Sequence, residues 1–457
     1  MSKVDFAIVG AGPAGIAAAC LATELGLETL IVDEQDAPGG QIYRGVERAQ
    51  PDTPLGPDYA AGQALVRAFR AAPVDYRPRT TVWHIDGEDL SLCLERGGRT
   101  ETIGADRILL ATGAFERPVP IPGWTLPGVM AAGGAQVLLK TAGLVPDGRT
   151  VLAGQGPLLY LLAGQLARAG APPAALLETT PVANWFAAAR HFVGLWPGRR
   201  MALKGLGLAR AVHSADIPIY RAAHGLRALG RGSLERIAWE GGEIAADHLL
   251  LHEGVIPNVQ ISLALQLRHE WDPAQLCWRP SVDDWGCTSL TGISIAGDSG
   301  GIAGAQAAVL SGKLAALDAA AGLGRIPQAD RDRRARPIRR SLASERALRP
   351  FLDTLYRPSP AILAPSDDAI VACRCEEVTV GQIRRAARLG AIGPNQLKAF
   401  TRCGMGPCQG RICGSVVTAT IADTLKKPMA EIGCFRPRAP YKPITVGALA
   451  DFETGLG

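Results

Sequence analysis

The chain lacks long apolar runs, a leader segment and a strong charge. None of its apolar stretches approaches the ~20 residues needed to cross a bilayer. Residues 1–10 run straight into a strand pattern rather than a charged leader with a cleavage site. The formal net charge of +5 over 457 residues is too small and too dispersed to favour nucleic acid as a partner. These absences predict a cytoplasmic protein with no membrane segment of its own, which could still meet a membrane through a partner.

Cysteine pairs of the C-x-x-C type are also absent, although the chain has ten cysteines. Cys20, Cys93, Cys277 and Cys287 are isolated, and free cysteine usually packs as a small apolar residue. Five of the other six fall between residues 373 and 413. Because a cytoplasmic chain keeps its thiols reduced, this density indicates metal ligands rather than disulfides.

The charged residues include one dense basic stretch. Six arginines lie between Arg331 and Arg340, beside Pro337. We interpret this stretch as a solvated linker or helix face rather than a phosphate site.

Glycine, by contrast, is plentiful. It contributes 54 of the 457 residues, more than the roughly 7% of an average protein. Strand-like residues 4–9 lead into G-A-G-P-A-G and a small-residue helix. In this pattern one glycine permits the turn, the next lets amides approach a pyrophosphate, and the last lets the helix pack on the strand. The helix N-terminus attracts the phosphate. The candidate residues are Gly10, Gly12, Pro13, Ala14 and Gly15.

An acidic pair follows at the spacing expected for a ribose ligand. The second strand, Leu30-Ile31-Val32, ends at Asp33 and Glu34, about 20 residues after the glycines. Counting alone does not choose between the two carboxylates. Strand, turn, helix, strand and acid in this order predict a dinucleotide-binding fold.

Three further motifs resemble the FAD site of glutathione-reductase-like flavoproteins. Residues 39–44, G-G-Q-I-Y-R, resemble the loop that closes over FAD, and residues 108–113 resemble the strand that ends in A-T-G. Residues 295–298 resemble the late G-D motif, whose aspartate holds the ribityl and pyrophosphate region. The candidate FAD-binding residues in these motifs are Gly40, Gln41, Arg44, Ala111, Thr112, Gly113, Gly297 and Asp298. Disulfide reductases add two cysteines beside the flavin, and their absence here argues against disulfide reduction.

A second strand, turn and helix begins at residues 150–157, but Leu159 stands where a third glycine would be. Residues 176–178 form a candidate second strand, with no arginine pair after it to favour a 2′-phosphate. Reductases of this class bind NAD(P)H in such an inserted domain. Both a working nicotinamide site and a retained fold without one stay open. His248 and His252 share a face of a predicted strand without a third ligand, so we interpret them as structural.

Four cysteines near the C-terminus form the main candidate metal site. Cys373 and Cys375 form C-R-C, and Cys408 and Cys413 form C-Q-G-R-I-C. Four thiolates suit iron or zinc, and ligand softness does not separate the two metals. Zinc knuckles usually pair as C-x-x-C, whereas this pattern resembles the bacterioferritin-associated ferredoxin domain, which carries a 2Fe-2S cluster. The second pair is wider here than in that ferredoxin, so Cys403 competes as the fourth ligand.

Helices are predicted around these cysteines. Thr379 is the expected N-cap of a helix over residues 380–389, and Gly390 is its expected stop. Further helices are predicted over residues 394–400 and 414–422.

Together, the motifs resemble the α (A) subunit of bacterial heteromeric amine and imino-acid dehydrogenases over nearly the whole chain. They are G-x-G-P-A-G, P-G-G-Q-I-Y-R, H-E-G-V-I-P-N, C-R-C-E-E-V-T and G-M-G-P-C-Q-G-R. That family includes opine oxidases, D-hydroxyproline and proline dehydrogenases, and hydrogen cyanide synthase. The resemblance implies FAD and a 2Fe-2S cluster in this chain. It also implies a D-amino-acid-oxidase-like β subunit that binds its own FAD and oxidises the C–N bond. It leaves room for FMN at the subunit interface and for a small ferredoxin-like γ subunit.

The expected fold class is α/β: a two-dinucleotide-binding-domain flavoprotein, glutathione-reductase-like, with an inserted second Rossmann-like domain and a small helical cysteine-cluster domain. The expected boundaries are residues 1–120 with 256–325 for the FAD-binding domain, 121–255 for the insertion, 326–365 for a linker, 366–430 for the 2Fe-2S domain and 431–457 for a tail.

We therefore expect an electron-transfer subunit of a heteromeric oxidoreductase that acts on CH–NH or CH–NH₂ donors. The sequence shows no constellation that would hold a substrate's carboxylate and amine, so no catalytic residue is assigned. Electrons from the partner's flavin would leave through this chain to a quinone or a carrier. The motifs fit opine, D-hydroxyproline, proline or glycine-type substrates equally. Two alternatives stay open: a stand-alone NAD(P)H-dependent FAD/2Fe-2S reductase, and a scaffold that keeps FAD structurally.

Overall fold

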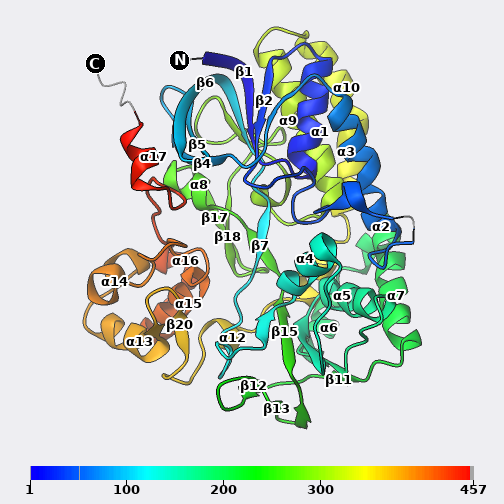
Figure 1. Cartoon of the computed structure of the whole chain (residues 1–457), viewed down its shortest axis with the longest axis vertical. Helices are drawn as coiled ribbons and strands as arrows, with labels where there is room; N and C mark the ends of the chain where they lie inside the picture. Colours follow the sequence, from blue (N-terminus) through cyan, green and yellow to red (C-terminus); the bar gives the residue numbers. More distant parts are fainter. Residues whose placement is uncertain (1, 51, 453–457) are drawn as a thin grey trace.

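The computed structural model describes residues 2–50 and 52–452 and forms three packed parts (Figure 1). The first part is built on a seven-stranded sheet in the order β3-β2-β1-β6-β5-β4, and β19 also pairs with β6. The pairs among β1, β2, β3, β6 and β19 are parallel, and the β5–β6 and β4–β5 pairs are antiparallel. The bounds are β1 Ser2–Val9, β2 Thr29–Val32, β3 Asp75–Arg77, β4 Thr81–Asp86, β5 Ser91–Arg96, β6 Arg99–Leu110 and β19 Ile293–Ile295.

Helices α1 (Pro13–Glu24) and α9 (Ala305–Gly322) pack against each other beside this sheet. Their small residues allow a very close approach, since a Cβ on Gly312 would lie 2.1 Å from the carbonyl oxygen of Ala14. The shorter elements of this part are η1 Val46–Arg48, α2 Pro57–Ala60, α3 Gly62–Ala71, α8 Gln260–Ala264, β17 His269–Asp272, β18 Cys277–Pro280 and η3 Gly297–Gly300.

The second part has a five-stranded parallel sheet in the order β11-β10-β9-β15-β8 and a small antiparallel sheet, β12-β13-β14. The chain enters it through β7 (Ala114–Glu116) and leaves through β16 (Val255–Pro257), which pair with each other. The strands are β8 Val129–Ala131, β9 Thr150–Gln155, β10 Ala175–Glu178, β11 Ile219–Arg221, β12 Arg227–Leu229, β13 Arg236–Trp239, β14 Gly242–Ala245 and β15 His248–Glu253. The helices are α4 Ala132–Ala142, α5 Pro157–Arg168, α6 Val182–Ala189, η2 Phe192–Leu195 and α7 Arg199–Ser214.

Residues 326–365, expected as a linker, fold into the helices α10 Gln328–Arg346, α11 Arg349–Leu355 and α12 Pro360–Leu363. Pro337 lies inside α10 and removes one backbone hydrogen bond. Burial of Ala335 and Leu342 in a cluster that also contains Leu314 and Leu317 of α9 offsets that loss. No helix among the described residues is long and apolar enough to cross a membrane.

The third part carries the cysteines and lies beside the other two (Figure 1). Its elements are β20 Val371–Cys373, β21 Val378–Thr379, α13 Val380–Arg388, α14 Pro394–Thr401, α15 Gly414–Leu425, α16 Met429–Ile432 and α17 Val446–Ala450. The predicted cap of α13 is confirmed, because Thr379 and Gln382 form a reciprocal capping box.

The residues expected as a tail return to the first part. The Tyr441 amide donates to the Trp83 carbonyl at 2.8 Å, and the Thr100 hydroxyl donates to the Ala448 carbonyl at 2.7 Å. On the other side, the Trp124 indole of the second part donates to the Val371 carbonyl at 2.8 Å. The cysteine part is therefore held against both dinucleotide-type parts.

Candidate flavin and cysteine sites

The first glycine turn is shaped by backbone approaches that only glycine allows. A Cβ on Gly15 would lie 1.9 Å from the Gly10 carbonyl oxygen. A Cβ on Gly10, whose φ is +107°, would lie 2.5 Å from the Ala111 carbonyl oxygen. At Gly12, by contrast, a Cβ would meet only Gly40 Cα, at 3.9 Å. Within the described chain no side chain caps α1, so its first-turn amides can bind a phosphate.

The G-G-Q-I-Y-R loop closes over this turn. The Gly39 amide donates to the Ala11 carbonyl at 2.8 Å. A Cβ on Gly40, whose φ is +60°, would lie 2.9 Å from Gly12 Cα. The two glycine turns therefore face each other across a narrow cradle that larger residues would fill.

Two cationic side chains lie at the rim of this cradle. Arg44 Nε is buried and has no hydrogen-bond partner in the part of the chain that the structure describes. Lys140 of α4 donates to the Gln41 carbonyl at 3.0 Å. Burial and the nearby Arg44 lower the pKa of Lys140 to about 8. An anionic ligand would satisfy the orphaned Arg44 donor. Lys140 lies outside the sequence motifs and was not among the candidate residues.

The structure distinguishes the two acids after β2. The Asp33 carboxylate accepts hydrogen bonds from the amides of Ala11, at 2.6 Å, and Gln35, at 2.7 Å. Burial raises the pKa of Asp33. Glu34 forms an ion pair with Lys442 at 2.6 Å. Asp33 therefore faces the glycine turn, and the geometry favours it as the ribose ligand.

The G-D motif after β19 lies against the start of α1. A Cβ on Gly297 would lie 2.9 Å from the Ala14 Cβ. The Asp298 carboxylate accepts hydrogen bonds from the amides of Ala303, at 2.9 Å, and Gly304, at 3.1 Å, which fixes the loop before α9.

The A-T-G segment, residues 111–113, lies at the same end of the first sheet as the glycine turn. The Ala111 amide donates to the Val9 carbonyl at 2.9 Å, and the Thr112 hydroxyl donates to the Asn258 carbonyl at 3.2 Å. The predicted flavin motifs follow the carboxyl ends of β1, β2, β6 and β19, which are parallel. The open cradle at Gly12, the uncapped α1 and the orphaned Arg44 donor fit a bound dinucleotide.

In the second part, the glycine turn that follows β9, at the corresponding edge of the sheet, is surrounded by buried side chains. Leu159, in the place of a third glycine, is fully buried. Glu178 ends β10, where an acid would take the ribose hydroxyls, and it is also buried. Tyr160 lies within hydrogen-bonding reach of its carboxylate, and the Thr180 hydroxyl donates to it at 3.4 Å.

Residues 355–357, from the expected linker, lie across this edge. Gln155, in the middle of the second glycine turn, donates its amide to the Arg357 carbonyl at 3.2 Å. Asn184 donates to the Leu355 carbonyl at 3.1 Å. Burial raises the pKa of Tyr356 to about 12. The backbone of residues 355–357 therefore lies against the second glycine turn and the start of α6.

A buried acid reinforces this closure. The Thr179 hydroxyl donates to Glu253 Oε1 at 2.6 Å. Glu253 Oε2 and Gln155 Oε1 have no partner among the described residues. Burial raises the pKa of Glu253 to about 7.

The two histidines of β15, His248 and His252, have different surroundings. His252 Nδ1 lies 2.5 Å from Glu116 Oε1, and the other oxygen of that carboxylate accepts the Gly133 amide at 2.7 Å. His252 thus joins β7, β15 and α4, in agreement with a structural role. His248 joins no group of possible metal ligands within the described residues.

Five thiols gather in the third part, as a group of three and a pair. The Sγ atoms of Cys373, Cys403 and Cys413 lie within 4.8 Å of one another, and the three residues are buried. The Sγ atoms of Cys375 and Cys408 lie 3.7 Å apart. All four predicted ligands are therefore close to another thiol, and the competing Cys403 lies with Cys373 and Cys413.

The pKa values within the group of three thiols shift in opposite directions. Hydrogen bonds from the Cys403 and Cys413 thiols, together with the amides of Gly404 and Glu376, lower the pKa of Cys373. The pKa values of Cys403 and Cys413 are raised. A metal centre would stabilise further thiolates, and hydrogen bonds to sulfur are a feature that tunes iron–sulfur sites. The thiol set fits such a centre.

Phe435 packs against three glycines of the loops that carry Cys403, Cys408 and Cys413. A Cβ would lie 2.6 Å from its ring at Gly404, 2.4 Å at Gly410 and 3.6 Å at Gly414. These glycines lie beside Cys403, Cys408 and Cys413 in the chain. Phe435 was not among the candidate residues predicted from the sequence, although the glycines next to the cysteines are consistent with a ring packed there.

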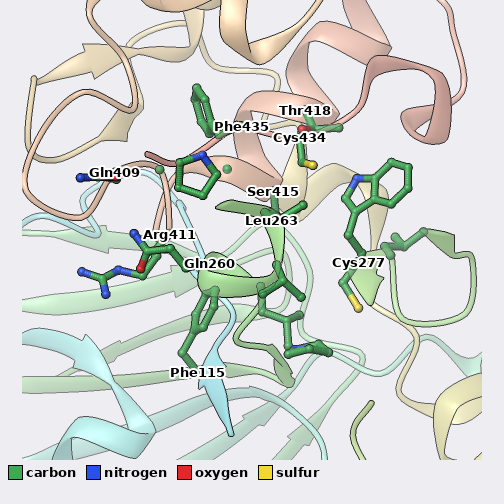
Figure 2. Close-up of a pocket in the computed structure, with 18 of the residues that line it drawn as sticks. Phe115, Gln260, Leu263, Cys277, Gln409, Arg411, Ser415, Thr418, Cys434 and Phe435 are labelled. Carbon is green, nitrogen blue, oxygen red and sulfur yellow. The ribbon is translucent and has the colours of Figure 1, made fainter. Parts of the chain in front are cut away.

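An apolar cavity of about 90 Å³ lies between the cysteine part and the first part (Figure 2). Gln409 and Arg411, which lie between two of the candidate ligands in the chain, and Phe115 of β7 are among the residues that line it. Cys277 and Cys434 line the cavity, but none of the five clustered thiols does so in the described chain. The cavity therefore borders the loop between Cys408 and Cys413, but the side chains of these two cysteines do not line it.

These features define a class of protein: a flavoprotein-type oxidoreductase chain with an open and a covered dinucleotide fold and a cysteine domain. A family model described as pyridine nucleotide-disulphide oxidoreductase matches residues 4–191. A model described as sarcosine oxidase A3 domain matches residues 372–452, which include most of the expected tail. The predicted fold class is confirmed.

The chain belongs to the family formed by the A subunits of opine oxidases. It is 43% identical to the A subunit of opine oxidase from Rhizobium meliloti (strain 1021), covering 99% of each chain. It is 34% identical to the HcnB subunit of hydrogen cyanide synthase from Pseudomonas aeruginosa, covering 98% of each. Among solved structures, L-proline dehydrogenase from P. horikoshii gives a TM-score of 0.71 at 19% identity, covering 98% of this chain and 79% of that chain. The last similarity shows the fold.

Proposed function

We propose that this chain is the electron-transfer flavoprotein and iron–sulfur subunit of a heteromeric dehydrogenase. A partner of D-amino-acid-oxidase type oxidises the C–N bond of an amino or imino acid, and this chain passes the electrons to an external acceptor. The names of the relatives support the assignment, because one belongs to opine oxidase and another to hydrogen cyanide synthase, each as one of its subunits.

The observation that carries the proposal is the five-thiol cluster in a chain that also has an open flavin-type cradle. Flavins exchange two electrons and 2Fe-2S clusters exchange one, which is the chemistry that a relay requires. Asp33, Arg44 and the first turn of α1 would hold FAD. Cys373, Cys375, Cys408 and Cys413 would hold the cluster, and the position of Cys403 supports it as a competing ligand.

The alternative of a stand-alone NAD(P)H-dependent reductase is less well supported. Such an enzyme needs an accessible nicotinamide site, whereas Gln155 and Asn184 bind the backbone of residues 355–357. A purely structural scaffold is a second alternative, but it would not need a cluster of reduced thiols.

The test is a comparison of the isolated chain with the complex formed with its partner subunit. Both are incubated with amino and imino acids and a dye that accepts electrons. We expect dye reduction by the complex alone, and loss of that activity in a complex that carries Cys373→Ser. Oxidation of the substrate at full rate by the isolated chain would contradict the proposed division of labour.

A further inference from the structure

The crossover between β10 and β11 exposes many large apolar side chains. Phe186 is 77%, Val193 88% and Trp196 80% exposed. We define the apolar surface as eight exposed side chains of α6, η2, α7 and the turn between them: Val182, Trp185, Phe186, Phe192, Val193, Trp196, Leu203 and Leu206. In α6, three of them follow the i, i+3, i+4 spacing of one helix face.

The apolar surface is large for a protein exposed to water. An aromatic side chain offers ~150–250 Å². With exposed fractions of 47%, 77%, 57% and 80%, the four aromatic members alone present on the order of 500 Å². The largest apolar patch of a typical monomer is ~300–600 Å² and is often functional. The exposed apolar area gathered in this one crossover is therefore of the order that is often functional in a monomer.

The charged groups around the apolar surface are mainly cationic, although Lys204 of α7 forms an ion pair with Asp58 at 2.8 Å. No acidic residue lies between Glu178 and Asp216. Arg190, Arg199, Arg200 and Arg210 are exposed, and none of them forms an ion pair within the described residues. A surface of this composition attracts anions.

Helix α10 extends this cationic rim. The Ser344 hydroxyl donates to the Pro197 carbonyl at 2.9 Å, next to Trp196. Arg340 precedes Ser344 by one helical turn and Arg336 by two, so both share its face of α10, and both are exposed. The arginine stretch noted in the sequence is thereby brought to the edge of the apolar surface.

We propose that the apolar surface docks this protein on the face of an anionic lipid bilayer. The aromatic side chains insert at the level of the headgroups, and the arginines meet lipid phosphates, as in interfacial amphipathic helices. A protein partner usually meets a rim of mixed polar residues, whereas this rim offers mainly cations. The contact is peripheral, and it does not depend on the proposed electron-transfer function.

Vesicle flotation of the full-length protein tests the proposal. We expect binding to vesicles of phosphatidylethanolamine and phosphatidylglycerol, weak binding to phosphatidylcholine alone, and release by high salt because exposed charges are screened. The double variant Val193→Ser/Trp196→Ser should lose binding. Val446→Ser is the matched control, because Val446 is 85% exposed on a different part. Arg199→Gln/Arg200→Gln should weaken binding roughly 25-fold, at about fivefold for each charge near an anionic surface.

Flavin content and unfolding temperature should be unchanged in these variants, since the altered side chains are exposed. Absence of flotation of the wild-type protein, or equal flotation of Val193→Ser/Trp196→Ser, would overturn the proposal. So would dissociation of the complex by that variant with unchanged vesicle binding, which would make the surface a subunit interface.

Discussion

Replacing Phe435 by alanine should separate the cysteine site from the flavin site. The ring is 4% exposed and fills the space left by glycines beside three of the five clustered thiols. Truncation of a buried phenylalanine costs about 3–5 kcal/mol. A part of this size is stabilised by only roughly 4–13 kcal/mol, so the substitution removes a large share of what holds the cysteine loops.

The assay measures iron, acid-labile sulfide and FAD per chain, together with visible circular dichroism. We expect Phe435→Ala to lose most of its iron and sulfide while it keeps its FAD, because the flavin cradle lies on another sheet. Phe435→Leu should fall between Phe435→Ala and the wild-type protein. Phe400→Ala is the control, since Phe400 lies in the same part but is 52% exposed. Full iron content and an unchanged spectrum in Phe435→Ala would refute the role of the ring.

Three further predictions concern the two dinucleotide folds. Asp33→Asn should weaken FAD binding roughly 10-fold or more, because it removes charge-assisted hydrogen bonds worth about 1.5–3 kcal/mol. Glu34→Gln is the control. Equal retention of FAD in the two variants would contradict the assignment of Asp33 to the ribose. Burial raises the pKa of Glu253 from 4.5 to about 7, so the native state holds a proton that the unfolded state releases. The free energy of unfolding should fall between about pH 4.5 and pH 7 by on the order of 3 kcal/mol. In urea unfolding, Glu253→Gln should remove this pH dependence. Equal dependence of the unfolding free energy on pH in the wild-type protein and in Glu253→Gln would contradict the buried, protonated state of Glu253. NADH or NADPH alone should leave the flavin oxidised in anaerobic stopped-flow experiments, because residues 355–357 cover the second turn, and rapid bleaching would disprove that closure.

The sequence identified Gly10, Asp33, Ala111 and Gly297 in motifs that each follow a short apolar strand. In the structure these strands are parallel, and their carboxyl ends bring the four residues to one edge of the sheet. The cap at Thr379 was also predictable, because a capping box depends only on residues three apart.

Other features depend on contacts between distant segments. The arginine stretch beside Pro337 predicted a solvated linker or helix face, which left the choice open. Helix α10 forms because its apolar face packs on α9 and because Arg331 and Arg339 stack on Trp285 at 4.2 and 4.3 Å. The position of Cys403 beside Cys413 likewise depends on how the loops fold around Phe435. Spacing in the sequence does not contain that information.

The most direct test of the relay is rapid-freeze electron paramagnetic resonance of the complex after it is mixed with its amino-acid or imino-acid substrate. The proposed relay predicts the signal of a reduced 2Fe-2S cluster, appearing at the rate of turnover, in the complex but not in the isolated chain or in a complex with Cys373→Ser. Full turnover with a cluster that stays oxidised, or with no iron in this chain, would contradict it.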